Sequence, residues 1–240
     1  NAFIGGCDGV SAVESARFLN ESPVGTMSHS LILVIGDEIE AFKDFDDVID
    51  KDIKRIALID TFSDEKFGAI KAVEALGEKL FAVRLDTPRS RRGDFINIME
   101  EVRWELDLRG FKDVKIFISG GIDEDKIWKY NKYAGAYGVG TAISNAPVID
   151  FSFDIVEVEG ESVGKRGKKS GAKQVWRCLS CLSDVILPER AEPEKCECGK
   201  KMVPLLRKYL KNGKISKKLL SPRDIRSYVL AQLEKYELEL

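Results

Sequence analysis

Short apolar runs alternate with amphipathic stretches along the first 141 residues of the chain. The clearest apolar runs are residues 56–59, 81–85, 114–118 and 136–139. Between them, apolar residues recur at helical spacing, which predicts helices from about residue 63 to Gly77, around residues 96–108, and after a capping Asp123. Continuous apolar strands that alternate with helices are typical of a parallel sheet covered on both faces.

An irregular (β/α) barrel and an open doubly wound sheet both satisfy this pattern, and two features favour the barrel. Polar or glycine residues stand at the carboxyl end of nearly every expected strand, where a barrel enzyme carries its chemistry. The last two strands end in glycine turns suited to phosphate. We count about six strand ends, including residues 3–6 and 24–26, where a full barrel has eight. Since residues 3–6 already have the composition of a buried strand, we expect a longer polypeptide.

The pattern changes after residue 148, which predicts three parts. Residues 1–148 form the α/β barrel. In residues 149–177, strict alternation over 151–158 predicts a strand with one wet face, part of a small β-rich domain that a missing N-terminal segment completes. Residues 178–240 form a zinc-knuckle extension and a C-terminal helix, which Ser221 begins as N-cap, followed by Pro222 and an acid at the third position.

Charge is distributed unevenly along the chain. Residues 160–220 hold 16 Lys and Arg against 6 Asp and Glu, a local net charge of +10, so the remainder carries −12 of the total of −2. This division supports a boundary near residue 160. No stretch approaches the roughly 20 apolar residues that span a bilayer, so we expect a cytoplasmic protein without membrane contact.

Four of the five cysteines fall within 21 consecutive positions: Cys178, Cys181, Cys196 and Cys198. Two close pairs separated by 14 residues suit tetrahedral Zn²⁺, because each pair offers two thiolates and the spacer brings the pairs together. With four cysteine ligands no coordination position is open, which predicts a structural zinc ion. Incidental cytosolic cysteines or a disulfide are the alternatives, and Cys7 stands apart as a small buried residue.

The single histidine, His29, lies where a helix is expected to begin near Ser28, after the possible strand end at Thr26. That junction belongs to the active face of a barrel. A lone histidine is more often structural than catalytic, and the spacing by itself leaves both interpretations open.

Several segments in this order resemble nicotinate phosphoribosyltransferases, particularly the archaeal type with a cysteine-rich C-terminal extension, and the resemblance covers nearly the whole chain. The segments are residues 3–11 (FIGGCDGVS), 24–30 (VGTMSHS), 84–87 (RLDT), 119–121 (SGG) and 138–141 (GVGT). That family, of type II phosphoribosyltransferases, makes nicotinate mononucleotide from nicotinate and phosphoribosyl pyrophosphate on an irregular barrel. The resemblance therefore implies a role in NAD biosynthesis.

The resemblance also implies roles for individual residues. His29 matches the histidine that ATP phosphorylates during turnover. The positions matching substrate-binding residues are Asp8 and Ser11 near the base, Thr26, Asp60, Arg84 and Asp86 around the diphosphate donor, and Ser119, Gly120, Gly121, Gly138, Gly140 and Thr141 around the ribose phosphate. Mg²⁺ and the co-substrate ATP are implied as well, together with a homodimer or higher homo-oligomer.

These residue types suit the implied chemistry. Departure of pyrophosphate leaves an oxocarbenium-like sugar, so catalysis consists mostly of positioning and charge stabilisation. Asp60 and Asp86 suit Mg²⁺ or ribose hydroxyls, and Arg84 offers a fork to the diphosphate. Each signature also has a structural interpretation, since strand-end acids cap helices and SGG is a tight turn. Where many bacterial relatives have Ser-Gly-Asp after the Arg-x-Asp strand, this chain has residues 87–94 with three arginines.

Two other functions fit part of the sequence. Quinolinate phosphoribosyltransferase shares the barrel and the donor, but it needs no ATP and lacks the Gly-Thr-x-x-His segment. A zinc-containing nucleic-acid-binding protein would use the +10 segment to contact phosphates. Trp176 and Tyr209 are too few aromatics there for a stacking surface, which disfavours nucleic acid.

Overall fold

The computed structural model describes residues 1–235. The chain divides into two compact units. One contains residues 11–17 and 22–147, and the other contains residues 1–10, 18–21 and 148–235 of the described chain. Each unit is described separately, and the first contains the candidate active-site residues.

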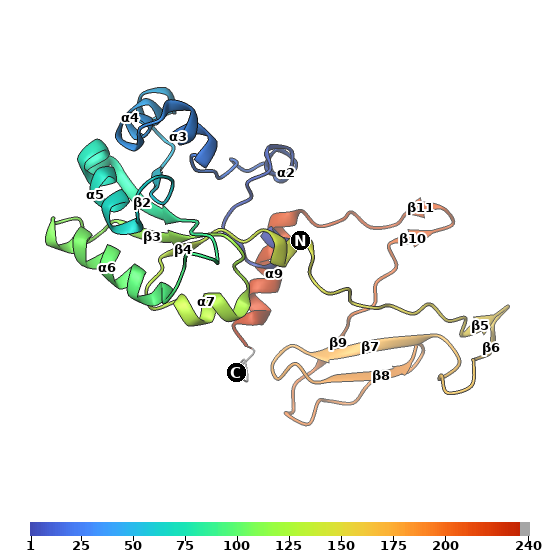
Figure 1. Ribbon diagram of the computed structural model, residues 1–240. Helices are drawn as coiled ribbons and strands as arrows, with labels where there is room; N and C mark the ends of the chain where they lie inside the picture. Colours follow the sequence, from blue (N-terminus) through green and yellow to red (C-terminus); the bar gives the residue numbers. More distant parts are fainter. Residues whose placement is uncertain (236–240) are drawn as a thin grey trace. The chain divides into compact units, whose positions relative to one another are not determined.

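A four-stranded parallel sheet forms the centre of the first unit, with strand order β1-β2-β3-β4 (Figure 1). The strands are β1 (Arg55–Leu58), β2 (Leu80–Leu85), β3 (Lys115–Ile118) and β4 (Ala136–Tyr137). The crossover helices are α5 (Glu65–Leu76), α6 (Phe95–Leu108) and α7 (Glu124–Tyr130), and the 3-10 helix η1 (Gly77–Lys79) precedes β2. Because neighbouring strands are parallel, their carboxyl ends lie along one edge of the sheet.

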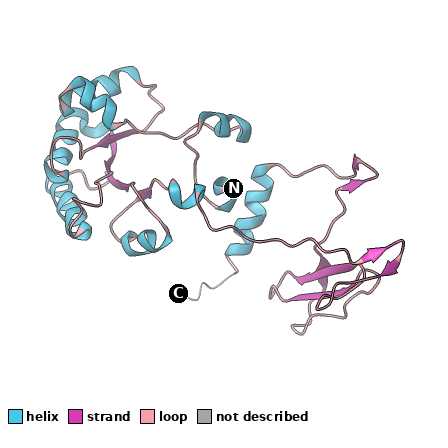
Figure 2. Cartoon of the chain, turned by 45° about the vertical axis from the view of Figure 1, so that its right-hand side comes forward, coloured by secondary structure: helices cyan, strands magenta, loops and turns pink. Residues whose placement is uncertain are grey.

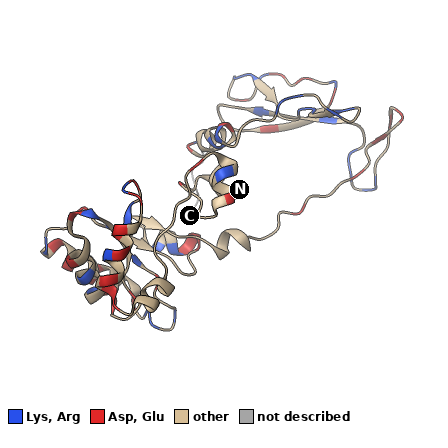
Figure 3. Ribbon diagram, turned by 90° about the horizontal axis from the view of Figure 1, so that it is seen from above, with Lys and Arg blue, Asp and Glu red and all other residues tan. Residues whose placement is uncertain are grey.

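Four more helices belong mainly to this unit: α2 (Val13–Leu19), α3 (His29–Ile35), α4 (Glu38–Val48) and the short α8 (Thr141–Ser144). Helix α5 lies against β1 and β2, and both α4 and α6 pack against α5 (Figure 1). Gly68 allows the closest approach, since a Cβ there would lie 1.9 Å from the carbonyl oxygen of Ile59. Both signs of charge are mixed over the helices around the sheet (Figure 3).

Short polar side chains begin these helices as the sequence leads one to expect. Side-chain oxygens accept hydrogen bonds from first-turn backbone N–H groups at Ser28, Asp37, Asp64, Asp94 and Asp123. The predicted end of α5 at Gly77 and the predicted cap at Asp123 are confirmed. All four residues of β1 are buried, and the core continues through β2, α5 and α6.

The second unit is β-rich (Figure 2). Its strands are β5 (Glu157–Val158), β6 (Glu161–Ser162), β7 (Lys173–Cys178), β8 (Asp184–Pro188), β9 (Met202–Pro204), β10 (Leu210–Lys211) and β11 (Lys214–Ile215). Strand β7 pairs antiparallel with β8 and β9, and β5–β6 and β10–β11 are separate hairpins. Helix α9 (Pro222–Leu233) begins with a capping box between Ser221 and Asp224, which confirms the predicted helix start.

Two strand expectations are wrong, and a third is confirmed only at its end. Residues 2–5 form a helix, α1 (Ala2–Gly5), which packs against α9, because a run of four apolar and glycine residues is too short to show a period. Residues 24–26 belong to no strand in the described part of the chain. Of residues 151–158, only β5 is paired, and Phe153 is 96% exposed. The alternating pattern begins before β5, but residues 151–156 belong to no strand of the described chain.

The barrel stays a prediction, since the parallel sheet among the described residues has four strands. No helix in that part of the chain is long and apolar enough to cross a membrane.

Candidate active site

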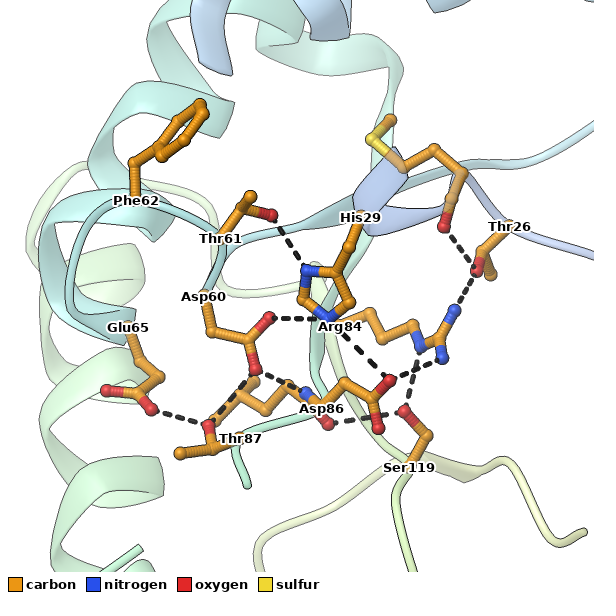
Figure 4. Close-up of polar contacts among 12 residues, drawn as sticks. Thr26, His29, Asp60, Thr61, Phe62, Glu65, Arg84, Asp86, Thr87 and Ser119 are labelled. Atoms are coloured by element: carbon orange, nitrogen blue, oxygen red, sulfur yellow. Dashed lines mark hydrogen bonds and ion pairs between the residues drawn. The ribbon is translucent and has the colours of Figure 1, made fainter. Parts of the chain in front are cut away.

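Polar side chains from four segments meet at the carboxyl edge of the parallel sheet (Figure 4). Asp60 follows β1, Asp86 follows β2, and Ser119 follows β3. His29 is the first residue of α3, where Ser28 is the N-cap and accepts a hydrogen bond from the Leu31 N–H. Four segments that are far apart in sequence thus supply one cluster.

The His29 ring lies between a hydroxyl group and two carboxylates. Its Nδ1 is 2.9 Å from Thr61 Oγ1. Its Nε2 is 3.8 Å from Asp60 Oδ1 and 3.7 Å from Asp86 Oδ2. The side chain is still 38% exposed. The ring therefore has a hydrogen-bond partner at Nδ1, two carboxylates near Nε2, and part of its surface open.

Arg84 connects three of these segments through one guanidinium group. Its Nε donates to Ser119 Oγ at 2.8 Å, and its Nη1 donates to Thr26 Oγ1 at 2.6 Å. Its Nη2 donates to Asp86 Oδ2 at 3.0 Å. The planar guanidinium holds all three partners at once, a geometry that a lysine ammonium cannot reproduce.

Asp60 is the most buried acid of the cluster, with a side chain 4% exposed. Its Oδ2 accepts a hydrogen bond of 2.6 Å from the Asp86 N–H and lies 3.2 Å from Thr87 Oγ1. Its Oδ1 is buried and has no hydrogen-bond partner among residues 1–235. Burial raises the pKa of Asp60 above its ordinary value, although the Asp86 N–H opposes this. A buried oxygen without a partner is where a cation or a ligand hydroxyl would bind.

The turn after β3 approaches the acids closely. Gly120 has φ +80°, and a Cβ there would lie 2.6 Å from Asp86 Oδ1. Arg92 holds this turn from outside, since its Nη2 donates to the carbonyl oxygens of Ser119, at 3.0 Å, and Gly120, and its Nε to that of Thr87 at 2.7 Å. Only glycine fits at position 120 without a shift of the Asp86 carboxylate.

The structure brings together most of the expected site residues. Those in or beside the cluster are Thr26, His29, Asp60, Arg84, Asp86, Ser119 and Gly120. Gly121 continues the same turn with φ +64°, and a Cβ on Gly138 would touch Ser119 Cβ at 3.2 Å. Gly140 is the N-cap of α8, and Thr141 is its first residue.

Two expected base-binding residues are not joined to the cluster. Asp8 is in the other compact unit, where its carboxylate lies 3.7 Å from Arg226. Ser11 is exposed, and no hydrogen bond is found for its side chain within the described part of the chain. Their roles stay predictions.

The sequence alone did not identify Thr61, Glu65 or Glu38 as parts of the site. Thr61 contacts His29, and Glu65 Oε1 contacts the Thr87 hydroxyl. Glu38 holds the segment that carries Thr61. Position at a strand end was a signal for Thr61, which directly follows Asp60. Nothing in the pattern marked Glu38, because an acid at the first position of a helix is ordinary.

The four clustered cysteines also meet. Their sulfur atoms all lie within 4.8 Å of one another, and the shortest separations are 3.4 Å between Cys181 and Cys196 and 3.5 Å between Cys178 and Cys198. These distances are far from the roughly 2.05 Å of a disulfide. Four thiolates at about 2.3 Å from a zinc ion would be about 3.8 Å apart. The cluster therefore fits a tetrahedral metal ion.

Little apolar packing surrounds the cysteines. Besides Cys178 and Cys196, the buried residues of this small core include only Met202, with Trp176 and Val185 partly buried against it. The hydrogen bond from the Ser183 hydroxyl contributes most to lowering the pKa of Cys181 to about 6, and the one from the Ser183 backbone contributes next. So small an apolar core buries little surface with which to stabilise this sheet.

Arg, Asp, Ser and Gly thus gather at the carboxyl edge of a parallel sheet, which is where open α/β sheets bind their ligands. The family model of the quinolinate phosphoribosyl transferase C-terminal domain matches residues 2–154. The chain belongs to this family of phosphoribosyltransferases.

Known proteins support this assignment. The chain is 30% identical over 190 residues to nicotinate phosphoribosyltransferase of Mycobacterium tuberculosis, and the match covers 74% of this chain and 40% of that protein. A crystal structure of nicotinate-nucleotide pyrophosphorylase from Pyrococcus furiosus is 53% identical, with a TM-score of 0.95 over 100% of this chain and 61% of that one. Human nicotinic acid phosphoribosyltransferase, at 18% identity and a TM-score of 0.74 over 99% of this chain and 61% of that chain, shares the fold. This chain therefore spans less than two thirds of each relative.

Proposed function

We propose that the protein is a nicotinate phosphoribosyltransferase, which forms nicotinate mononucleotide and pyrophosphate from nicotinate and phosphoribosyl pyrophosphate. The observation that carries the proposal is the His29 ring, held by Thr61 and flanked by Asp60 and Asp86. The name of the Mycobacterium relative supports nicotinate as the acceptor.

The site residues have distinct tasks in this reaction. Arg84 pairs with the diphosphate as it departs, and the acids stabilise the positive charge that develops on the sugar. The N–H groups of Ser119 and Gly138 bond the carbonyl oxygens of Leu85 and Ile118, so these two residues shape the 5′-phosphate site. The backbone N–H groups of Gly120, Gly121, Gly140 and Thr141 bind the phosphate. Asp60 and Asp86 would hold Mg²⁺, which neutralises diphosphate charge when bound. Catalysis rests on positioning and charge rather than on a covalent sugar intermediate.

ATP enters the proposal through His29. A ring nitrogen attacks the γ-phosphorus of ATP, the bond to the β-phosphate oxygen breaks, and ADP leaves. Water later cleaves the N–P bond and releases phosphate, which returns the neutral ring. Coupling this hydrolysis to turnover would drive synthesis of the nucleotide in NAD biosynthesis.

Steady-state assays of the full-length protein test the substrate. We expect nicotinate mononucleotide from nicotinate and phosphoribosyl pyrophosphate, with turnover stimulated by ATP, and no release of CO₂ from quinolinate. Activity on quinolinate without ATP stimulation would instead establish the alternative that shares the family name. Nicotinamide is assayed for comparison as an acceptor, since it differs from nicotinate only by an amide in place of the carboxylate.

We also propose that Cys178, Cys181, Cys196 and Cys198 hold a structural zinc ion. The proposal is supported by the sulfur separations and by the small core around them. Zinc would supply the cross-link that this part of the chain lacks. A homodimer or higher oligomer in the cytoplasm completes the proposal, and sedimentation of the full-length protein measures its oligomeric state.

A further inference from the structure

Glu38 is a buried acid outside the cluster that surrounds His29. It is the first residue of α4 and is 1% exposed. Its Oε1 accepts hydrogen bonds from the backbone N–H groups of Phe62, at 3.0 Å, and Ser63, at 3.2 Å. Its Oε2 accepts from Ser63 Oγ and from Lys71 Nζ, both at 2.8 Å. Both carboxylate oxygens are thus used to hold the segment between β1 and α5.

That segment carries two of the groups around the histidine. Thr61, whose hydroxyl is 2.9 Å from His29 Nδ1, directly precedes the two residues that Glu38 holds. The Phe62 side chain is 53% exposed and points away from the polar cluster (Figure 4), so apolar packing of this ring does not fix the segment. Thr61 thus stands between two anchored positions: the Asp86 N–H holds Asp60 before it, and Glu38 holds Phe62 and Ser63 after it.

The starts of α3 and α4 are both hydrogen-bonded to the segment that follows β1. Helix α3 begins at His29 and ends at Ile35 with Gly36 as its C-cap, and Asp37 caps α4 immediately before Glu38. The start of α3 is tied to the segment after β1 by Thr61, and the start of α4 is tied to the same segment by Glu38. A displacement of the segment would therefore move the Thr61 hydroxyl away from the ring.

Burying a carboxylate is costly unless it is paired and fully hydrogen-bonded. Burial acts to raise the pKa of Glu38, but hydrogen bonds from Lys71, Phe62 and Ser63 outweigh it and hold the pKa below the ordinary value. Glu38 is therefore ionised at neutral pH and accepts hydrogen bonds at both oxygens.

We propose that Glu38 is a positioning residue for His29: it fixes residues 61–63 so that the Thr61 hydroxyl stays on Nδ1 and the ring keeps Nε2 toward Asp60 and Asp86. The proposal rests on the proposed function for its effect on turnover, and on geometry alone for its effect on the ring. A neutral or shorter side chain at position 38 releases the segment and leaves the ring free to rotate.

Asp46 provides a matched control on the same helix. Its side chain is 10% exposed, and it pairs with Arg55 at 2.6 Å and with Lys79. These partners hold the end of α4, since Arg55 also donates to the carbonyl oxygens of Asp46 and Ile49. Asp46→Asn therefore removes a buried paired charge from α4 without touching the segment that holds Thr61.

The experiment compares Glu38→Gln, Thr61→Val and Asp46→Asn in the full-length protein. The ¹⁵N resonances of the His29 ring, identified by their loss in His29→Asn, report hydrogen bonding at each nitrogen. We expect Glu38→Gln to shift the Nδ1 resonance in the same direction as Thr61→Val and to lower kcat about tenfold, the loss of one charge-assisted hydrogen bond. The KM for phosphoribosyl pyrophosphate should change less than about twofold, because Glu38 is not among the residues that bind this substrate in the proposal. Asp46→Asn should lower thermal stability only.

The proposal is overturned if Glu38→Gln has the same His29 resonances and the same kcat as the wild-type protein. It is also overturned if Asp46→Asn changes both readouts as much as Glu38→Gln does. If Glu38→Gln does not fold, Glu38→Asp retains the charge but shortens the reach to Phe62 and Ser63, and the same shift is expected. Failure of the proposed function is a separate outcome. If the wild-type protein has no ATP-coupled activity, the ¹⁵N resonances of the His29 ring still show whether Glu38 positions the ring.

Discussion

Asp60 Oδ2 accepts a hydrogen bond of 2.6 Å from the backbone N–H of Asp86, which fixes the acids after β1 and β2 relative to each other. The other oxygen of Asp60 and one oxygen of Asp86 both face His29 Nε2, at 3.8 Å and 3.7 Å. Two carboxylates and one imidazole therefore share a small volume at the edge of the sheet. The protonation of Asp60 should then control what the site can bind.

Acid should inactivate the enzyme through Asp60. Burial raises the pKa of Asp60, so on acidification this carboxylate takes up its proton at a higher pH than an ordinary aspartate. We expect kcat/KM to fall through that pH range. Carboxyl ¹³C resonances measure the titration directly: Asp60 should titrate above the ordinary range and Asp46 below it, because hydrogen bonds from Lys79 and Arg55 lower the pKa of Asp46.

The same shift links Asp60 to stability. Because its pKa is raised on folding, the native state binds more protons, and this carboxyl contributes less stability as the pH rises through the native pKa. Asp60→Asn should therefore keep or raise the free energy of unfolding at neutral pH while activity falls. A strong loss of stability at neutral pH would contradict a raised pKa.

Replacing Arg84 by lysine should impair catalysis far more than folding. Lysine cannot hold Ser119, Thr26 and Asp86 together, and hydrogen bonds of charged groups contribute about 1.5–3 kcal/mol. We expect kcat/KM to fall about 10- to 100-fold. Arg103→Lys is the control, since Arg103 donates to the carbonyl oxygens of Phe111 and Val114 outside the site. Similar activity losses in both variants would show that the effect is not specific to the site.

Gly120 and Gly110 separate backbone strain from the close approach to Asp86. Their φ angles are +80° and +88°, but a Cβ on Gly110 meets no atom within 4 Å, whereas one on Gly120 meets Asp86 Oδ1 at 2.6 Å. Each alanine variant should lose about 1–3 kcal/mol of stability through strain. Only Gly120→Ala should also lose affinity for phosphoribosyl pyrophosphate, measured by calorimetry. Unchanged affinity in Gly120→Ala would contradict the assigned role of this turn.

Zinc content tests the cysteine cluster. Cys196→Ser should abolish bound zinc, measured by atomic absorption, and lower the melting temperature, because removing one thiolate opens the tetrahedral site. Cys7→Ser changes the one cysteine outside the cluster and should leave zinc unchanged. A wild-type protein purified without metal that is stable to chelators would contradict the proposal.

Much of the fold follows from local patterns in the sequence. Apolar runs placed β1 to β4, and caps such as Asp123 and Ser221 marked helix starts because their side chains bond first-turn N–H groups. The run at residues 3–6 was misassigned, because helix α1 depends on packing against α9, more than 200 residues away. The local pattern of apolar residues cannot reveal this contact between α1 and α9.

The candidate site shows the same limit. Strand-end positions identified Asp60, Arg84, Asp86 and Ser119, since parallel strands bring their carboxyl ends together. The sequence could not identify Glu38 or Arg92 as supports, because their contacts with Phe62 and with Gly120 depend on the path of two loops. Loop paths are set by tertiary packing rather than by residue type.

Incubation of the full-length protein with γ-³²P-labelled ATP tests the central claim most directly. We predict acid-labile label on His29, absent in His29→Asn, and its discharge as inorganic phosphate when nicotinate and phosphoribosyl pyrophosphate are added. A fully active enzyme that carries no label on His29, or whose label is not discharged by the substrates, would contradict the account.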